Sequence, residues 1–159
     1  MPRSSCIFCK IIAGKQKADT IYEDDRVLAI LDKNSFTEGH TVIMTKKHYE
    51  NIFDVDPEDL KQVILVAKKL SLFYKKELHC DGVNILHASS KIAGQSVMHF
   101  HIHLVPRYKT DNLGNLWYRN RNQCINNFLV RGRILTSKYY KMLGPQNKLK
   151  PSKLGFQTA

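Results

Sequence analysis

The clearest periodic segment of the chain has apolar residues at every third or fourth position. It begins at Asp56-Pro57, a helix-capping residue followed by a proline at the first helical position, and it ends shortly before Gly82. Its apolar positions share one face of a helix, and they are Leu60, Val63, Ile64, Ala67, Leu70 and Tyr74. The pattern therefore predicts one long helix over about 57–78.

Shorter apolar runs of the kind found in strands lie on both sides of this helix. Turn-forming pairs such as Asp24-Asp25 and Ala93-Gly94 separate them. The runs cover residues 20–23, 27–31, 40–45, 83–87 and 97–105. They predict a five-stranded antiparallel sheet. A second, short helix at about 5–13 would join the long helix on one face of this sheet, giving an α+β domain.

The regular pattern extends only to about residue 107. A chain of 159 residues fits one domain with a real core. We therefore expect a domain over 1–107 and an extension over 108–159 that packs on the domain or is partly mobile. No apolar run near the first residues is long enough for a signal peptide or a membrane span, so we expect a cytoplasmic protein with no membrane partner.

Positive charge is concentrated in this extension. The formal net charge is +11, of which residues 105–159 carry +10 and residues 1–104 only +1. A field of this sign attracts phosphorylated ligands or nucleic acid. A solvated basic tail without a specific partner explains the charge equally well, so both interpretations stay open.

Three histidines alternate with apolar residues in His99-Phe100-His101-Ile102-His103. On a strand, alternate side chains share a face, so the histidines would face a site while Phe100 and Ile102 pack into the core. Two residues advance a strand by about 6.7 Å, so the outer histidines lie too far apart for one metal ion to bind all three easily. The preceding Gly94-Gln95-Ser96 offers the close backbone approach and the donors that hold phosphate oxygens. An unprotonated imidazole is a competent nucleophile, which points to phosphate chemistry.

The run resembles the signature of the histidine triad (HIT) family, in which three histidines alternate with apolar residues and two more apolar residues follow, as in 99–105. The resemblance extends over residues 5 to about 107 and is to the bacterial, Hint-like branch of the family. It includes Cys6-Ile7-Phe8-Cys9-Lys10-Ile11-Ile12, Tyr22-Glu23-Asp24-Asp25, Leu28-Ala29-Ile30-Leu31-Asp32, Gly39-His40-Thr41 and Lys46-Lys47-His48. The family implies a HIT-like α+β fold, a homodimer, and hydrolysis of nucleoside phosphoramidates or dinucleoside polyphosphates at the α-phosphate of a bound purine nucleotide.

The resemblance also implies a role for particular residues. His101 would be the nucleophile that forms a nucleotidyl-histidine intermediate, and His103 would hold the phosphate. Further nucleotide contacts would come from Asp32 to the ribose hydroxyls, Gln95 and Ser96 to the phosphate, and Ile11, Ile30 and Leu31 to the base. No catalytic metal is obligatory for this chemistry.

The pair Cys6 and Cys9 forms a C-x-x-C motif in a chain with no export signal, which favours metal or redox use over a disulfide. The family resemblance implies a structural zinc ion bound by both cysteines, His48 and His99, which fits the four nitrogen or sulfur ligands of such sites. Reduced, metal-free cysteines are the alternative.

One position departs from the family pattern. An asparagine often precedes the Gly-Gln-Ser turn in the family, whereas residues 86–90 read Leu-His-Ala-Ser-Ser. Either Ser89 or Asn84 replaces it, or turnover is weaker than usual. His40, His79 and His87 receive no role beyond surface or packing.

Two other functions are compatible with the sequence. The protein could be a zinc-stabilised nucleic-acid-binding protein, or it could remove adenylate from nucleic-acid ends, with the basic extension holding the strand in both cases.

Overall fold

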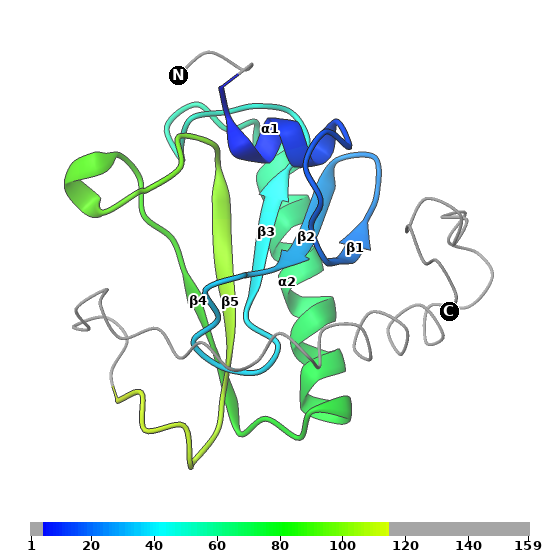
Figure 1. Ribbon diagram of the computed structural model, residues 1–159, viewed down its shortest axis with the longest axis vertical. Helices are drawn as coiled ribbons and strands as arrows, with labels where there is room; N and C mark the ends of the chain where they lie inside the picture. Colours follow the sequence, from blue (N-terminus) through cyan, green and yellow to red (C-terminus); the bar gives the residue numbers. More distant parts are fainter. Residues whose placement is uncertain (1–4, 115–159) are drawn as a thin grey trace.

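A computed structural model describes residues 5–114, which form a five-stranded antiparallel sheet with two α-helices (Figure 1). The strand order is β1-β2-β3-β5-β4. In chain order, the elements are α1 (Ile7–Ile12), β1 (Thr20–Glu23), β2 (Val27–Leu31), β3 (Thr41–Thr45), α2 (Pro57–Glu77), β4 (Gly82–Leu86), the 3-10 helix η1 (Lys91–Ala93) and β5 (His101–Arg107). This arrangement confirms the α+β prediction.

The long helix α2 forms where its sequence signals place it. The Asp56 side chain accepts a hydrogen bond from the Glu58 backbone N–H, and Pro57 occupies the first turn. The buried face of α2 contains Val63, Val66, Ala67, Leu70, Phe73 and Tyr74. These side chains pack on one face of the sheet. Among the described residues, no helix combines the length and apolar character needed to cross a membrane.

The two helices lie on opposite faces of the sheet, so the prediction that they share a face is wrong. Ile43 of β3 packs with the α2 side chains, whereas its neighbours Val42 and Met44 pack with Phe8 of α1. Figure 1 shows α2 behind the strands and α1 in front of their upper ends. Because successive strand residues point to opposite faces, a fully buried strand such as β3 creates a second apolar face, which α1 covers.

Strand β5 begins at His101, four residues after the predicted start at 97. The preceding residues leave the sheet because their backbone bonds elsewhere: Phe100 N–H donates to the Tyr49 carbonyl at 2.7 Å. Residues 108–114 continue from β5 and contact the domain through Asp111, which accepts hydrogen bonds from Arg107. The rest of the predicted extension lies outside the described residues.

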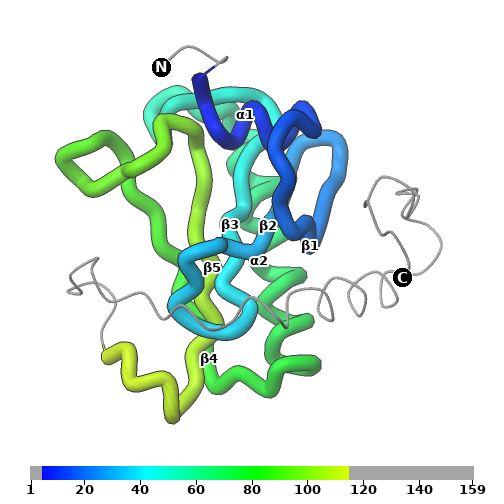
Figure 2. Tube along the Cα trace, in the orientation of Figure 1, coloured from blue at the N-terminus to red at the C-terminus, as the bar shows by residue number. Residues whose placement is uncertain are grey.

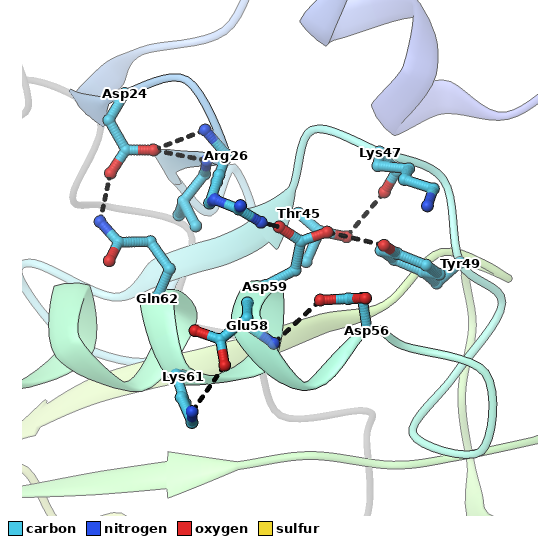
Figure 3. A network of polar contacts seen from close by, with 11 residues as sticks. Asp24, Arg26, Thr45, Lys47, Tyr49, Asp56, Glu58, Asp59, Lys61 and Gln62 are labelled. Carbon is cyan, nitrogen blue, oxygen red and sulfur yellow. Dashed lines mark hydrogen bonds and ion pairs between the residues drawn. The ribbon is translucent and has the colours of Figure 1, made fainter.

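A buried carboxylate ties the start of α2 to the loop that carries His48. Asp59, only 5% exposed, accepts hydrogen bonds from Tyr49 Oη at 2.7 Å and Arg26 Nη1 at 2.6 Å (Figure 3). Burial opposes ionisation of Asp59, but the hydrogen bonds from Tyr49 and Arg26 outweigh it and hold the pKa below its usual value. The network therefore holds Tyr49, the neighbour of His48, more strongly while Asp59 is charged.

We expect Asp59→Asn to lower Tm at neutral pH and to change its pH dependence. A depressed pKa means that the unfolded chain takes up the proton first, so the contribution of Asp59 is complete above about pH 4 and disappears as the pH falls through its folded pKa. The gap in Tm between wild type and variant should therefore narrow as the pH falls below about 4. Thermal unfolding at several pH values measures it, with the exposed Asp25→Asn as the control. A gap that is constant with pH would contradict this role.

Candidate active site

His101, the first residue of β5, is held in one tautomer. Its Nδ1 lies 2.6 Å from the His99 carbonyl oxygen, which can only accept a hydrogen bond, so Nδ1 carries the proton and Nε2 carries the lone pair. The ring is 6% exposed and packs edge-on against Phe8. Burial lowers the pKa of His101 to about 4. At neutral pH the ring is thus an uncharged imidazole with a basic Nε2, the form that acts as a nucleophile.

A pocket of about 420 Å³ lies over this histidine, between α1, the end of β2 and the turn before β5. This volume lies within the usual range for small-molecule sites. Figure 2 shows that α1 and the segment joining β4 to β5 meet at the same end of the sheet. The lining includes all but one of the residues that the sequence assigned to the nucleotide: Ile11, Ile30, Leu31, Asp32, Ser96, His101 and His103.

Asp32 supplies a negative charge to this pocket. Its Oδ1 accepts a hydrogen bond from the Asn34 backbone N–H at 2.8 Å, and its Oδ2 lies 3.5 Å from His103 Nδ1. Burial opposes ionisation, but the contacts with His103 and His40 and the Asn34 hydrogen bond outweigh it and lower the pKa of Asp32 to about 2. An ionised carboxylate is an acceptor for hydroxyl groups, such as those of a ribose.

Gln95 is the predicted phosphate contact whose side chain does not line the pocket. Its Nε2 donates to the Glu50 carbonyl at 2.6 Å and to the Val97 carbonyl at 2.9 Å. Its Oε1 accepts from the Ser90 backbone N–H at 2.7 Å. All the polar atoms of this buried side chain are therefore engaged in ordering the turn. The neighbouring Ser96 faces the pocket.

Neither proposed replacement for the family asparagine lines the pocket. Asn84 lies in the middle of β4, where it pairs with Val105, and its Oδ1 accepts a hydrogen bond from Arg107 Nη1 at 2.7 Å. Ser89 Oγ accepts from the Ile52 backbone N–H and lies 2.7 Å from His87 Nε2. His87 Nδ1 in turn lies 2.7 Å from the carbonyl oxygen of His101, so this segment fixes the backbone of the candidate nucleophile.

The four predicted zinc ligands converge at the start of α1, with their ligand atoms all within 4.8 Å of one another. His99 Nδ1 lies 3.2 Å from His48 Nδ1, 3.5 Å from Cys6 Sγ and 3.6 Å from Cys9 Sγ. A tetrahedral zinc ion with bonds of about 2.3 Å to sulfur and about 2.0 Å to nitrogen requires edges of about 3.3 Å between nitrogens and about 3.5 Å between sulfur and nitrogen.

The orientation of His99 also fits a metal ligand. Its Nε2 lies 2.7 Å from the Thr45 carbonyl and therefore carries the proton, which leaves the Nδ1 lone pair directed at the cysteines and His48. Metal-bound histidines typically donate their other N–H to a carbonyl or carboxylate in this way. The donor set and its geometry therefore fit zinc.

His40 is the residue at this site that the sequence left without a role. It is 1% exposed, stacks on Phe36, and its Nε2 lies 3.0 Å from His103 Nδ1. His40 comes close to His103 because Val42, two residues later in the chain, pairs with His103 across β3 and β5. This register is set by tertiary structure, so the only signal in the sequence was the position of His40 in a segment that matches the family.

Comparisons with known proteins agree with this geometry. Residues 13–110 match the family model described as HIT domain. The chain is 42% identical over 114 residues to Protein hit of Bacillus subtilis, covering 71% of this chain and 79% of that protein.

Solved structures give the same fold. A zinc-bound histidine triad family protein from Mycobacterium smegmatis is 34% identical, with a TM-score of 0.73 over 88% of this chain and 96% of that chain. A HIT family hydrolase from Clostridium thermocellum is 30% identical, with a TM-score of 0.59 over 67% of this chain and 93% of that chain.

Proposed function

Because this chain belongs to the HIT family, we propose that it is a purine-nucleotide hydrolase that cleaves nucleoside phosphoramidates or dinucleoside polyphosphates at the α-phosphate. One observation carries the proposal: the His99 carbonyl holds the proton of His101 on Nδ1, so that a pocket-lining imidazole keeps a basic Nε2. The similarity to the HIT family hydrolase from Clostridium thermocellum supports hydrolysis as the reaction class.

The reaction would proceed in two displacements at phosphorus. His101 Nε2 attacks the α-phosphorus, a P–N bond forms, and the bond to the amine or polyphosphate leaving group breaks. Water then attacks the nucleotidyl-histidine and releases the nucleoside monophosphate. The positive charge that His101 acquires in the intermediate is stabilised by its Nδ1–H bond to the His99 carbonyl. His103 and Ser96 would donate to the phosphate oxygens as charge develops there.

The remaining pocket residues would hold the nucleoside. The ionised Asp32 accepts hydrogen bonds from the ribose hydroxyls, and Ile11, Ile30 and Leu31 provide an apolar surface for the base. Gln95 would act indirectly rather than by contacting the nucleotide, because its side chain orders the turn from which Ser96 reaches the pocket.

The zinc ion would be structural. Cys6 and Cys9 begin the helix whose residues Ile7, Phe8 and Ile11 line the pocket, so bonds to His48 and His99 would fix this wall against the sheet. When bound, zinc supplies a cross-link and no chemistry at phosphorus. The zinc-bound relative supports this assignment.

A substrate panel tests the function. Purified protein is incubated with adenosine and guanosine phosphoramidates and with dinucleoside polyphosphates, and the products are separated by chromatography. We expect release of a nucleoside monophosphate, and quenched reactions should contain protein whose mass has increased by one nucleotidyl group. Absence of hydrolysis across the panel would refute the proposal.

We further propose that the protein is a homodimer, as the family resemblance implies. Strand β4 is an edge strand of the sheet formed by residues 5–114. Its Val83 and Ile85 are 37% and 42% exposed. An edge strand with exposed apolar side chains favours pairing with another chain, because both its backbone groups and its apolar surface gain partners.

Ile85→Lys should convert the dimer to a monomer. The charge would have to be buried against the partner chain without a charged partner, and this cost opposes association. Light scattering coupled to size-exclusion chromatography measures the mass, and Ile92→Lys, on the exposed η1 helix, is the control. A dimer that persists in Ile85→Lys would exclude the β4 edge as the interface.

A further inference from the structure

Strand β4 ends too early to hold the backbone of the candidate nucleophile. Its last residue, Leu86, lies opposite His103, so a longer strand would place residue 88 opposite His101. In an antiparallel sheet, the backbone groups of successive residues bond to opposite neighbours. The Phe100 N–H bonds to the segment that follows β3. The His101 carbonyl therefore points toward the other side, beyond the end of β4.

The side chain of His87 meets this carbonyl in place of a strand. Its Nδ1 lies 2.7 Å from the His101 carbonyl oxygen, and because that oxygen can only accept, Nδ1 carries a proton. The ring also packs against Phe100, with the ring centroids 4.9 Å apart. The imidazole thus supplies the donor that a backbone N–H of a longer β4 would supply.

A second contact fixes the orientation of this ring. His87 Nε2 lies 2.7 Å from Ser89 Oγ, which accepts a hydrogen bond from the Ile52 backbone N–H at 3.1 Å. The hydrogen bonds therefore form a chain from a backbone amide through two side chains to the His101 carbonyl. The bonds of such a chain polarise one another. Because both ring nitrogens are engaged, the Nδ1 donor stays directed at the carbonyl.

We propose that His87 is a positioning residue that holds the backbone of His101 so that Nε2 of the nucleophile faces the substrate phosphorus. This inference rests on the proposed function of the pocket. His87 does not line the pocket, so it acts through His101 and not on the nucleotide. The His101 ring is itself bonded to the His99 carbonyl, so a shift of this backbone displaces Nε2 as well. A displacement of about 1 Å can slow a reaction by about 100-fold.

Packing against Phe100 is the competing explanation for His87. Two amide variants separate the explanations, because each loses the ring but retains a donor at a different place. In His87→Asn the amide nitrogen lies near the position of Nδ1, within reach of the His101 carbonyl. In His87→Gln it extends to the position of Nε2, next to Ser89. If the ring only fills space, the two variants should behave alike.

Steady-state kinetics test the positioning. We expect His87→Ala to lower kcat by about 10- to 100-fold with a much smaller change in KM, because the pocket walls remain while the nucleophile shifts. His87→Asn should recover most of kcat, whereas His87→Gln should stay close to His87→Ala. The matched control is Asn84→Ala, which removes a hydrogen bond from Arg107 on the same strand without reaching His101. It should lower Tm and leave kcat unchanged.

Normal kcat in His87→Ala, or equal kcat in the Asn and Gln variants, would refute the proposal. Amide hydrogen exchange of the full chain tests the same contact without turnover. The peptide unit that contains the His101 carbonyl also contains the Ile102 N–H. In His87→Ala, exchange at Ile102 should become about tenfold faster relative to Leu104, two residues further along β5, and His87→Asn should reverse this change.

Long-range ¹H–¹⁵N correlation spectra of the wild type should show a proton on His87 Nδ1. An unprotonated Nδ1, or unchanged exchange at Ile102 in His87→Ala, would overturn the proposal. If the exchange and the spectra agree with the contact but no nucleotide is hydrolysed, the hold on His101 stands and the proposed function alone is wrong.

Discussion

Replacing His101 with alanine is expected to reduce hydrolysis of nucleoside phosphoramidates by about four orders of magnitude or more. The variant lacks the only atom proposed to form a bond to phosphorus, so the covalent route is lost completely. The pocket walls and Asp32 remain, so nucleotide binding should persist within about tenfold. Single-turnover kinetics measure the chemical step, and mass spectrometry of quenched samples should find no nucleotidyl adduct.

His79→Asn is the matched control for this experiment. His79 is an exposed histidine outside the pocket, and its positive φ of 53° is a conformation that asparagine tolerates. This variant should hydrolyse substrate at the wild-type rate. If His101→Ala retained substantial activity, the covalent mechanism would be wrong, whatever else the pocket binds.

Replacing Cys9 with alanine is expected to produce the largest loss of stability. Protein purified without added metal should contain about one zinc ion per chain, and the variant close to none, because three remaining ligands bind zinc far more weakly. When the free zinc concentration is about a thousandfold above Kd, a bound ion stabilises the folded state by about 4 kcal/mol. Tm should fall accordingly, and adding a chelator to the wild type should reproduce the change.

Cys80→Ala provides the comparison. Cys80 is a buried thiol in the core beneath α2 and takes no part in the four-ligand cluster. Its loss should cost some stability through reduced packing, while zinc content stays at one ion per chain. Wild-type protein with almost no zinc, or Cys9→Ala with unchanged zinc, would reject the site.

Local signals predicted the elements well where they were strong. The cap at Asp56 and the periodic apolar face placed α2 to within one residue at its end. The start of β5 was missed, because residues 97–100 alternate like a strand but the Phe100 N–H bonds to the carbonyl of Tyr49, a contact between distant parts of the chain. The position of α1 was missed for a similar reason, since alternation alone does not reveal which face of a buried strand each helix covers.

At the site, the sequence identified reactive side chains but not their partners. His101, His103 and Asp32 do line one pocket. Gln95 carries the right chemical group, but three backbone contacts engage it elsewhere. His40 depends on the register between β3 and β5, which the sequence does not specify. The predicted nucleic-acid role of the basic extension falls mainly on residues outside 5–114 and stays a prediction.

One residue belongs to both of the sites proposed above. The side chain of His99 points to the cysteine pair, while its carbonyl oxygen holds Nδ1 of His101. If zinc is bound there, oxidation of either thiol would remove a ligand and leave the His99 ring held only by its hydrogen bond to the Thr45 carbonyl, and any shift of His99 would reach the nucleophile through its own carbonyl oxygen. Hydrolysis would then be sensitive to thiol oxidants although neither Cys6 nor Cys9 lines the pocket.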